Sequence, residues 1–316
     1  MRAAWRMIAQ RRAAGRWSGA LVLVALVCAV PAHASVCCMT AGLFGVGRLA
    51  LWEQAAVGVR ATGAETFGAW SAEGAWTPSP AGWVDRELRL DGYALLRLSE
   101  RGQIHVLLPT VGNVRGADPD VAAGGGLGDV ELGVRYELVN VGERAFVPAI
   151  GVTASALLPS SVRPEEATGR LDVDATGRGA PGVAGAVSFE QALGTLFGRV
   201  DLGGTLYAPF VRVDLRQHQR YGPTLAAVAS GGGTVAGGLL LGLTAGVAHD
   251  LPVVIAKEEQ PGSSATSATA GVLASWTVDP HWTLLASASS GLFVDALGQN
   301  RPGRVTASLG VRYGAW

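Results

Sequence analysis

Charged residues occupy every second position in several otherwise apolar segments of this chain. In residues 126–138 (GLGDVELGVRYEL), Asp129, Glu131, Arg135 and Glu137 alternate with apolar side chains. This alternation is typical of a β-strand with one apolar face and one charged face. Carboxylates and guanidiniums that share a water-filled space can pair with one another or bind a passing solute.

The same alternation marks twelve charged or titratable residues as candidates for the inner face of a barrel. They are Arg60, Glu87, Arg89, Asp91, Arg97, His105, Glu131, Arg135, Glu190, Arg199, Asp201 and Arg312. Buried alone, each charge would cost several kcal/mol, but a wet lumen or a partner across it makes the charge tolerable. We therefore predict that these residues line a lumen. The alternative is an ion-pair network that closes a narrow barrel.

Catalytic and metal-binding patterns are weak. Asp214 and His218 share a predicted loop, but no Ser or Cys motif accompanies them, and a catalytic triad is recognised by its geometry. The run Asp172 to Asp174 (DVD) could contact a divalent cation, although a calcium site needs six or more oxygen ligands. We predict no enzyme activity, no metal and no cofactor.

The composition limits the class of protein. The 316 residues are 49% hydrophobic and only 16% charged, and 45 of them are glycine. Soluble domains usually carry about 25% charged residues. The formal net charge is zero, which offers no basic field for nucleic acid. This composition favours a β-protein with one apolar face per strand.

The N-terminus has the pattern of an export signal. Arginines precede an apolar stretch at 19–30, which is short for a membrane span, and Ala32-His33-Ala34 matches a cleavage site. We predict a signal peptide over 1–34, a periplasmic segment over 35–48 and an outer-membrane barrel over 49–316. Neither Cys28 nor Cys37 follows the small residue of a lipoprotein site. The role of the adjacent pair Cys37 and Cys38 stays open.

After the predicted signal peptide, the sequence pattern predicts a series of β-strands joined by turns and loops. The predicted spans are 49–61, 85–98, 103–113, 127–139, 143–157, 182–193, 196–210, 222–231, 234–248, 265–278, 282–296 and 303–315. Short turns, including NVG at 140–142 and a GG turn near 232, alternate with long loops at 62–84, 114–126, 158–181, 211–221, 249–264 and 297–302. This rhythm predicts an all-β fold: a transmembrane up-and-down antiparallel β-barrel of about twelve strands in a Gram-negative outer membrane.

Aromatic residues support a membrane location. Six of them lie near predicted short turns or the C-terminus, on the apolar face by parity: Tyr136, Phe146, Phe189, Trp276, Trp282 and Tyr313. An outward ring of this kind predicts a membrane-interface girdle. In the last strand, Ser308, Gly310 and Tyr313 resemble the signal that barrel-assembly machinery reads, although Trp316 is out of phase with Tyr313.

Residues 126–138, a short turn and residues 146–161 (FVPAIGVTASALLPSS) resemble the outer-membrane barrel family named for the MetA pathway of phenol degradation. That family typically has a Pro-Thr-Gly motif where this chain has Pro159-Ser160-Ser161. Residues 188–207 resemble the family's middle hairpin. The resemblance implies a barrel that passes small, often apolar or aromatic compounds, and it supplies no catalytic residues.

Together these observations predict an outer-membrane channel or transporter for small, apolar or aromatic solutes. Its expected partners are outer-membrane lipid, the barrel-assembly machinery and a small solute. A non-conducting structural or adhesion barrel, whose long loops bind a partner, is the alternative, and a soluble exported β-protein is a third possibility. The sequence leaves the solute, the direction of transport, the open state of the lumen and the oligomeric state undetermined.

Overall fold

The computed structural model describes residues 47–144, 146–212, 217–293 and 297–316. The predicted signal peptide at 1–34, Cys37 and Cys38 lie outside these ranges, and so does Asp214. Most of the predicted periplasmic segment, 35–46, also lies outside them.

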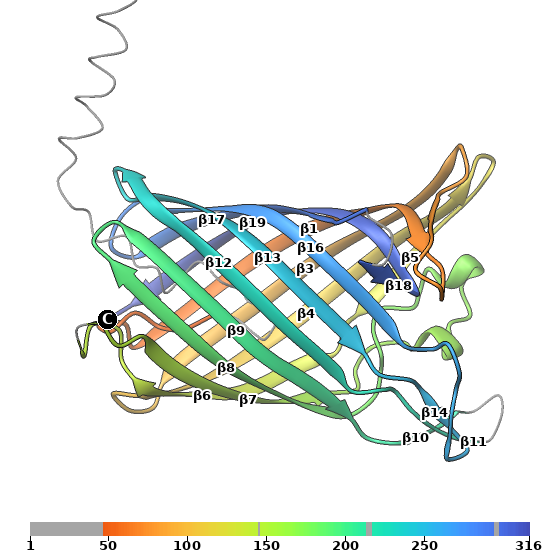
Figure 1. Cartoon of the computed structure of the whole chain (residues 1–316), viewed down its shortest axis with the longest axis horizontal. Helices are drawn as coiled ribbons and strands as arrows, with labels where there is room; N and C mark the ends of the chain where they lie inside the picture. The colour runs from red at the N-terminus through yellow and green to blue at the C-terminus, as the bar shows by residue number, and fades with distance from the viewer. Residues whose placement is uncertain (1–46, 145, 213–216, 294–296) are drawn as a thin grey trace, which may run out of the picture.

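A closed antiparallel β-barrel forms almost the whole described chain (Figure 1). Its twelve wall strands are β1 (Ala55–Trp70), β3 (Trp83–Arg97), β4 (Gly102–Ala117), β6 (Val130–Val139), β7 (Ala149–Leu158), β8 (Gly182–Leu193), β9 (Leu196–Tyr207), β12 (Thr224–Ala236), β13 (Leu239–Asp250), β16 (Ala265–Thr277), β17 (Trp282–Gly291) and β19 (Arg301–Ala315). Each strand pairs with its neighbours in sequence, and β1 pairs with β19, which closes the sheet. The prediction of a twelve-stranded up-and-down barrel is confirmed.

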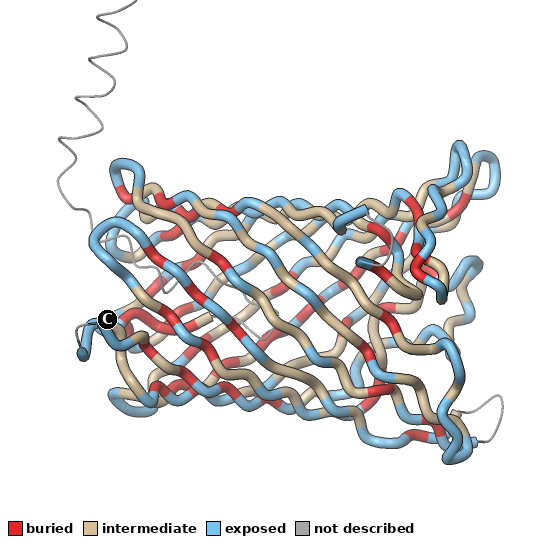
Figure 2. Tube along the Cα trace, in the orientation of Figure 1, coloured by how far each residue is buried: buried red, intermediate tan, exposed pale blue. Residues whose placement is uncertain are grey.

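Burial alternates along the strands, as Figure 2 shows. In β6, Arg135 and Glu137 are buried, whereas Val134, Tyr136 and Leu138 are about half exposed. A barrel wall is one layer thick, so only the interior can shield a side chain. The exposed apolar side chains form the outer surface. Leaving so much apolar area in water is unfavourable by about 25 cal/mol per Å², whereas lipid accepts it.

The connections differ in length at the two ends of the barrel. Short turns such as Gly194–Thr195 and Gly237–Gly238 lie at the end that holds the C-terminus (Figure 1). The opposite end carries the long connections 159–181 and 251–264, together with residues 208–212 and 217–223. In outer-membrane barrels the short-turn end faces the periplasm and the long-loop end faces outward.

The first predicted strand, 49–61, is displaced in the structure. β1 begins at Ala55 and continues to Trp70, so Phe67 and Trp70 belong to a strand and not to a loop at 62–84. The start is later because residues 47–53 fold into the barrel. The end is later because β1 keeps its partner β19 as far as Arg301.

Two predicted turns also differ. The predicted GG turn near 232 is wrong: Gly231, Gly232 and Gly233 are paired within β12, and the chain reverses at Gly237–Gly238. Both turn glycines have positive φ, 52° and 79°, which tight hairpin turns require and which glycine adopts at little cost. The predicted strand 143–157 starts only at Ala149, so Phe146 lies in a longer turn, with a φ of 64°.

The predicted loop at 114–126 is mostly a hairpin. β4 continues to Ala117 and pairs with β5 (Asp120–Leu127) beyond the point where it leaves β6. The hairpin projects from the long-loop end of the barrel (Figure 1).

Several short elements lie at the long-loop end of the barrel. They are β2 (Trp76–Pro78), β18 (Gly298–Gln299), the small sheet of β10 (Phe210–Arg212), β11 (Gln217–Arg220), β14 (Val254–Ile255) and β15 (Glu258–Glu259), and the 3-10 turns η2 (Pro164–Glu166) and η3 (Arg170–Asp172). Within the described ranges, no helix is long and apolar enough to cross a membrane.

Candidate functional site

The twelve residues that the sequence marked as lumen candidates all lie on barrel strands. Seven are buried: Asp91, His105, Arg135, Glu190, Arg199, Asp201 and Arg312. The other five, Arg60, Glu87, Arg89, Arg97 and Glu131, are partly buried. Most of them come from the half of the wall between β1 and β9, so this half is much more charged than the rest.

Asp91 joins two arginines. Its Oδ2 atom accepts a hydrogen bond from Arg60 Nη2 at 2.6 Å, and its Oδ1 atom accepts one from Arg89 Nε at 2.6 Å. Nearby, Glu87 pairs with Arg304 of β19, with Nη1 and Oε2 2.9 Å apart. These contacts tie β1, β3 and β19 together across the seam where the barrel closes.

His105 and Glu131 form a second group on β4 and β6. The His105 Nε2 atom lies 3.2 Å from Glu131 Oε1 and 3.5 Å from the Ser155 hydroxyl. Both contacts use the same ring nitrogen. A Ser–His–acid triad uses one nitrogen for the nucleophile and the other for the acid. This cluster therefore does not have the geometry of a nucleophilic site.

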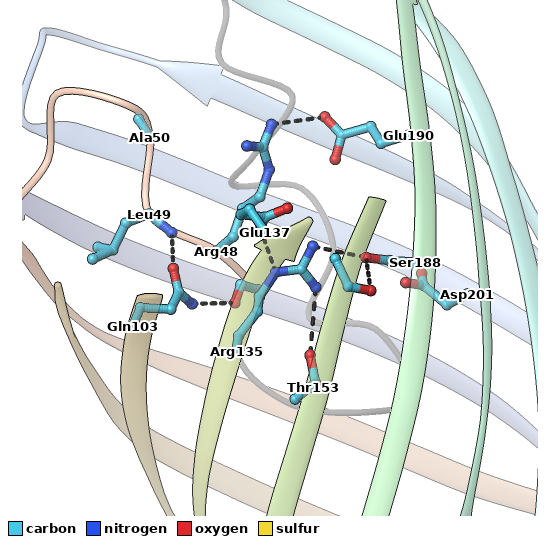
Figure 3. A network of polar contacts seen from close by, with 12 residues as sticks. Arg48, Leu49, Ala50, Gln103, Arg135, Glu137, Thr153, Ser188, Glu190 and Asp201 are labelled. Carbon is cyan, nitrogen blue, oxygen red and sulfur yellow. Dashed lines mark hydrogen bonds and ion pairs between the residues drawn. The ribbon is translucent and has the colours of Figure 1, made fainter. Parts of the chain in front are cut away.

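Arg135 lies at the centre of a third group, shown in Figure 3. Its guanidinium donates to Glu137 Oε1 at 2.6 Å and to the Ser188 hydroxyl at 2.7 Å. Thr153 lies at the edge of hydrogen-bonding range, 3.5 Å away. Arg135 thereby links β6 with β7 and β8. Glu137, two residues after Arg135 on the same face, was not among the predicted site residues, although its spacing indicates it.

Glu190, Arg199 and Asp201 form a fourth group on β8 and β9. Arg199 Nη2 lies 2.8 Å from Asp201 Oδ1, and Arg199 Nη1 lies 3.8 Å from Glu190 Oε2. The other Glu190 oxygen accepts a hydrogen bond from Arg48 Nη2 at 3.0 Å. Arg48 precedes the first strand, and no strand periodicity could have marked it as a lumen residue.

The segment from Gly47 to Glu53 lies inside the barrel at the short-turn end. The Leu49 amide donates to Gln103 Oε1 at 2.8 Å, and Gln103 Nε2 donates to the Gly47 carbonyl at 3.1 Å (Figure 3). Glu53 pairs with Arg312 of β19, with Nη1 and Oε1 2.6 Å apart. Arg97, another predicted lumen residue, donates to the Glu53 carbonyl at 2.7 Å and to the Ala50 carbonyl.

The remaining wall, from β12 to β19, has a smaller and mostly uncharged inner face. Ser287 and Ser308 share a hydrogen bond of 2.7 Å, and so do Ser289 and Thr306. At the short-turn end, Leu240 and Leu273 of this wall form a buried apolar cluster with Phe197 of β9. The lumen therefore has a charged side and a side of small hydroxyl and glycine residues.

The connection 159–181 folds across the long-loop end of the barrel. On one side, Asn113 Nδ2 of β4 donates to the carbonyls of Val173 and Ala175 at 3.0 and 2.8 Å. On the other side, Arg178 Nη2 lies 2.6 Å from Asp250 Oδ2 at the end of β13. A pocket of about 330 Å³ remains between this connection and β3 and β4, where Arg89 and Glu87 line it.

Aromatic side chains secure the same connection. The Tyr221 hydroxyl donates to Glu165 Oε2 at 2.9 Å, and the Arg163 guanidinium lies 4.1 Å from the centre of the Phe210 ring. Burial, followed by the adjacent Glu165 carboxylate, raises the pKa of Tyr221 above its ordinary value. Tyr221 therefore keeps its proton and remains a donor at physiological pH. The connection is a structured cover rather than a free loop.

The six predicted girdle residues all lie toward the short-turn end, and all are exposed on the outside. Their exposed fractions run from 36% for Tyr313 to 88% for Phe146. Trp282 and Tyr313 are paired across β17 and β19, with ring centres 5.0 Å apart in an edge-to-face arrangement. Phe146 differs from the others because it lies in a turn and not on a strand.

No family model and no curated protein matches the sequence. Among solved structures, an outer membrane channel from Pseudomonas putida F1 superposes with a TM-score of 0.70 at 16% identity, over 84% of this chain and 97% of that one. The NanC porin (TM-score 0.44, 10% identity, 81% and 98% covered) and the CymD monoaromatic hydrocarbon channel (TM-score 0.42, 8% identity, 83% and 88% covered) are more distant. At such identities the first likeness shows the fold alone, and this chain has the fold of an outer-membrane β-barrel.

Proposed function

We propose that this protein is an outer-membrane channel or transporter for small solutes in a Gram-negative bacterium. The observation that carries the proposal is the division of one closed wall into two surfaces. The outer surface is mostly apolar, with aromatic residues toward one end, and the inner surface is polar, with buried ion pairs on one side and small hydroxyl residues on the other. Such a wall separates lipid from a polar interior, which is what a solute pathway across a membrane requires.

The solute class rests on the resemblance of residues 126–161 and 188–207 to the barrel family named for the MetA pathway of phenol degradation. Small apolar or aromatic compounds are the class that it implies. The similar channel from Pseudomonas putida F1 supports a channel role in general. The C-terminal run Ser308, Gly310 and Tyr313 supports insertion by the barrel-assembly machinery. The proposal assigns the chain no catalytic step.

A non-conducting barrel is the second candidate, and one observation favours it. The Gly47–Glu53 segment and the ion pairs around it occupy the lumen at the short-turn end. Barrels of modest strand number can be filled by their own side chains. In this case the connection 159–181 at the other end would be the functional surface, because it folds across that end and is held there by Asn113 and Asp250.

Single-channel recording separates the two candidates. The full mature protein is refolded, its barrel state is verified by heat-modifiable migration in gels, and it is inserted into a planar bilayer. Discrete and repeatable current steps, together with uptake of small solutes by proteoliposomes, are the expected result. A verified barrel that gives neither current nor uptake, even when the Arg48–Glu190 pair is removed, would overturn the channel proposal and support the non-conducting barrel.

A further inference from the structure

The pocket beneath the connection 159–181 has a roof that the barrel wall holds in place. Asn113, which lines the pocket and is 2% exposed, donates from Nδ2 to two carbonyls of the connection at 3.0 and 2.8 Å. Arg115, also on β4, donates from Nη1 to the Asp172 carbonyl at 2.9 Å. These contacts fix the roof above a volume of about 330 Å³. Pockets that bind small molecules begin at about this size.

Arg89 lines this pocket, and only one of its three side-chain nitrogens is engaged. The Nε atom donates to Asp91 Oδ1 at 2.6 Å, and among the described residues this is the one hydrogen bond that the Arg89 side chain makes. The side chain is 38% exposed, so both Nη atoms can bind a solute. Two Nη atoms of one guanidinium have the geometry to bind both oxygens of a carboxylate.

Arg60 contacts the same aspartate in a different way. Its Nε and Nη2 atoms both donate to Asp91 Oδ2, at 3.2 and 2.6 Å, and it does not line the pocket. The Asp91 side chain is only 1% exposed. A solute in the pocket therefore meets the guanidinium of Arg89 and not the acid behind it. Asp91 positions Arg89, and Arg60 supplies the second positive charge that keeps Asp91 ionised within the wall.

Two acidic residues also line the pocket, and neither of them binds the Nη atoms of Arg89. The Oε2 atom of Glu87 accepts a hydrogen bond from Arg304 Nη1 at 2.9 Å, so its charge is balanced within the wall. Asp172 belongs to the connection and is exposed, so water and salt screen its charge. The apolar part of the lining comes from Val111, Pro164 and Ala175.

We propose that this pocket binds the carboxylate of a small organic acid, with the two Nη atoms of Arg89 as donors and the connection 159–181 as the roof. The apolar lining accepts the body of the acid. The pocket lies at the long-loop end, which a solute from outside the cell reaches first. The inference rests on the proposed channel function and narrows its solute class to small acids with an apolar body.

Three ligands of nearly equal shape separate the effect of charge from that of size. At neutral pH benzoate is an anion, benzamide is uncharged and benzamidine is a cation. In calorimetric titrations of the refolded full mature protein, we expect benzoate to bind about tenfold or more tightly than benzamide, because its hydrogen bonds to Arg89 are charge-assisted. Benzamidine should bind more weakly than both. Equal affinities for benzoate and benzamide, or a preference for benzamidine, would refute the site.

Variants of the two arginines test the assignment to Arg89. Arg89→Gln should weaken benzoate binding about tenfold to a hundredfold and leave benzamide binding nearly unchanged. Arg89→Lys keeps the charge without the planar fork and should restore part of the affinity. Arg60→Gln is the matched control, because it removes the same charge from the same aspartate without changing the pocket lining. All three barrels are verified by heat-modifiable migration. If Arg60→Gln weakens benzoate binding as much as Arg89→Gln, the pocket is not the binding site.

Single-channel recording distinguishes failure of the site from failure of the channel. Benzoate is expected to interrupt the current of the unmodified protein in a concentration-dependent manner, and to do so much less in Arg89→Gln. Current steps from a protein that shows no calorimetric binding of benzoate would overturn the site and leave the channel proposal intact. A verified barrel that binds benzoate through Arg89 but passes no current would support the site and count against the channel.

Discussion

Asp91 and Arg60 lie directly opposite one another on β3 and β1, with the carboxylate Oδ2 atom 2.6 Å from Arg60 Nη2. Arg89 binds the other carboxylate oxygen, so a single acid with no exposed surface holds two guanidiniums. The arrangement sits beside the seam between β1 and β19, where the two ends of the sheet meet. Loss of these contacts would therefore affect barrel closure more than loss of similar contacts elsewhere in the wall.

Asp91→Asn is therefore expected to destabilise the barrel by about 2–4 kcal/mol, because an amide cannot balance two positive charges in a buried position. Urea unfolding in lipid vesicles, followed by gel migration, measures the change. Glu65→Gln breaks only an exposed pair and should change the free energy of unfolding by about 0.5 kcal/mol or less. Similar losses for both variants would show that burial does not strengthen the Asp91 contacts.

Gly133 provides a second test, of packing inside the lumen. A Cβ atom at this position would overlap the His105 ring and the Ser155 hydroxyl. Gly133→Ala should cost about 1–3 kcal/mol, since overpacking displaces neighbouring side chains. It should also break the 3.2 Å contact between His105 and Glu131, which imidazole NMR signals would report.

The matched control for Gly133 is Gly63, which lies on β1 with open space where a Cβ would be added. Gly63→Ala is expected to change stability by less than about 0.5 kcal/mol, as most surface substitutions do. If Gly133→Ala is as well tolerated as Gly63→Ala, the inner face at His105 is wider than the structure implies.

Trp282 and Tyr313 test the predicted aromatic girdle. Their rings meet edge to face across β17 and β19, so Trp282→Ala and Tyr313→Ala should each lower stability in lipid. The double variant should show a coupling of about 0.5–1.5 kcal/mol. The loss of stability of each variant is measured both in lipid vesicles and in detergent micelles. A stability loss that is equal in both would indicate simple packing rather than a membrane-interface role.

Asp174 tests the pH response of the connection 159–181. The Thr168 and Gly169 amides each donate to its carboxylate at 2.9 Å, and these hydrogen bonds, that of Thr168 first, hold the pKa of Asp174 below its ordinary value. The ionised form thus stabilises the folded connection. This stabilisation is complete above the ordinary Asp pKa and is lost as the pH falls through the lowered one.

Limited proteolysis of the connection should accordingly be constant between neutral pH and the ordinary Asp pKa, and should increase in stronger acid. Asp174→Asn should be cleaved faster at neutral pH and should show a weaker acid response. A connection that resists protease equally in both proteins at neutral pH would mean that Asp174 does not hold it.

The sequence by itself determined the barrel. Two-residue alternation in segments such as 126–138 predicts which side chains face inward, because successive residues of a strand point to opposite sides. It also predicts that the sheet closes, because hydrocarbon leaves no partner for an unpaired edge. The twelve candidate inner-face residues were selected from this alternation alone. The predicted number of strands, about twelve, came from short turns and long loops that alternate along the sequence.

Only the tertiary structure decided which charges meet. Arg48 and Glu190 are 142 positions apart, and Glu53 and Arg312 are 259 apart. Their contacts exist because closure of the barrel brings β8 and β19 to face one another across the lumen, around a segment that has no strand period of its own. Turn positions such as Gly237–Gly238, and not 232, were likewise decided by the register between β12 and β13, since a run of small residues allows several registers and the paired neighbours select one.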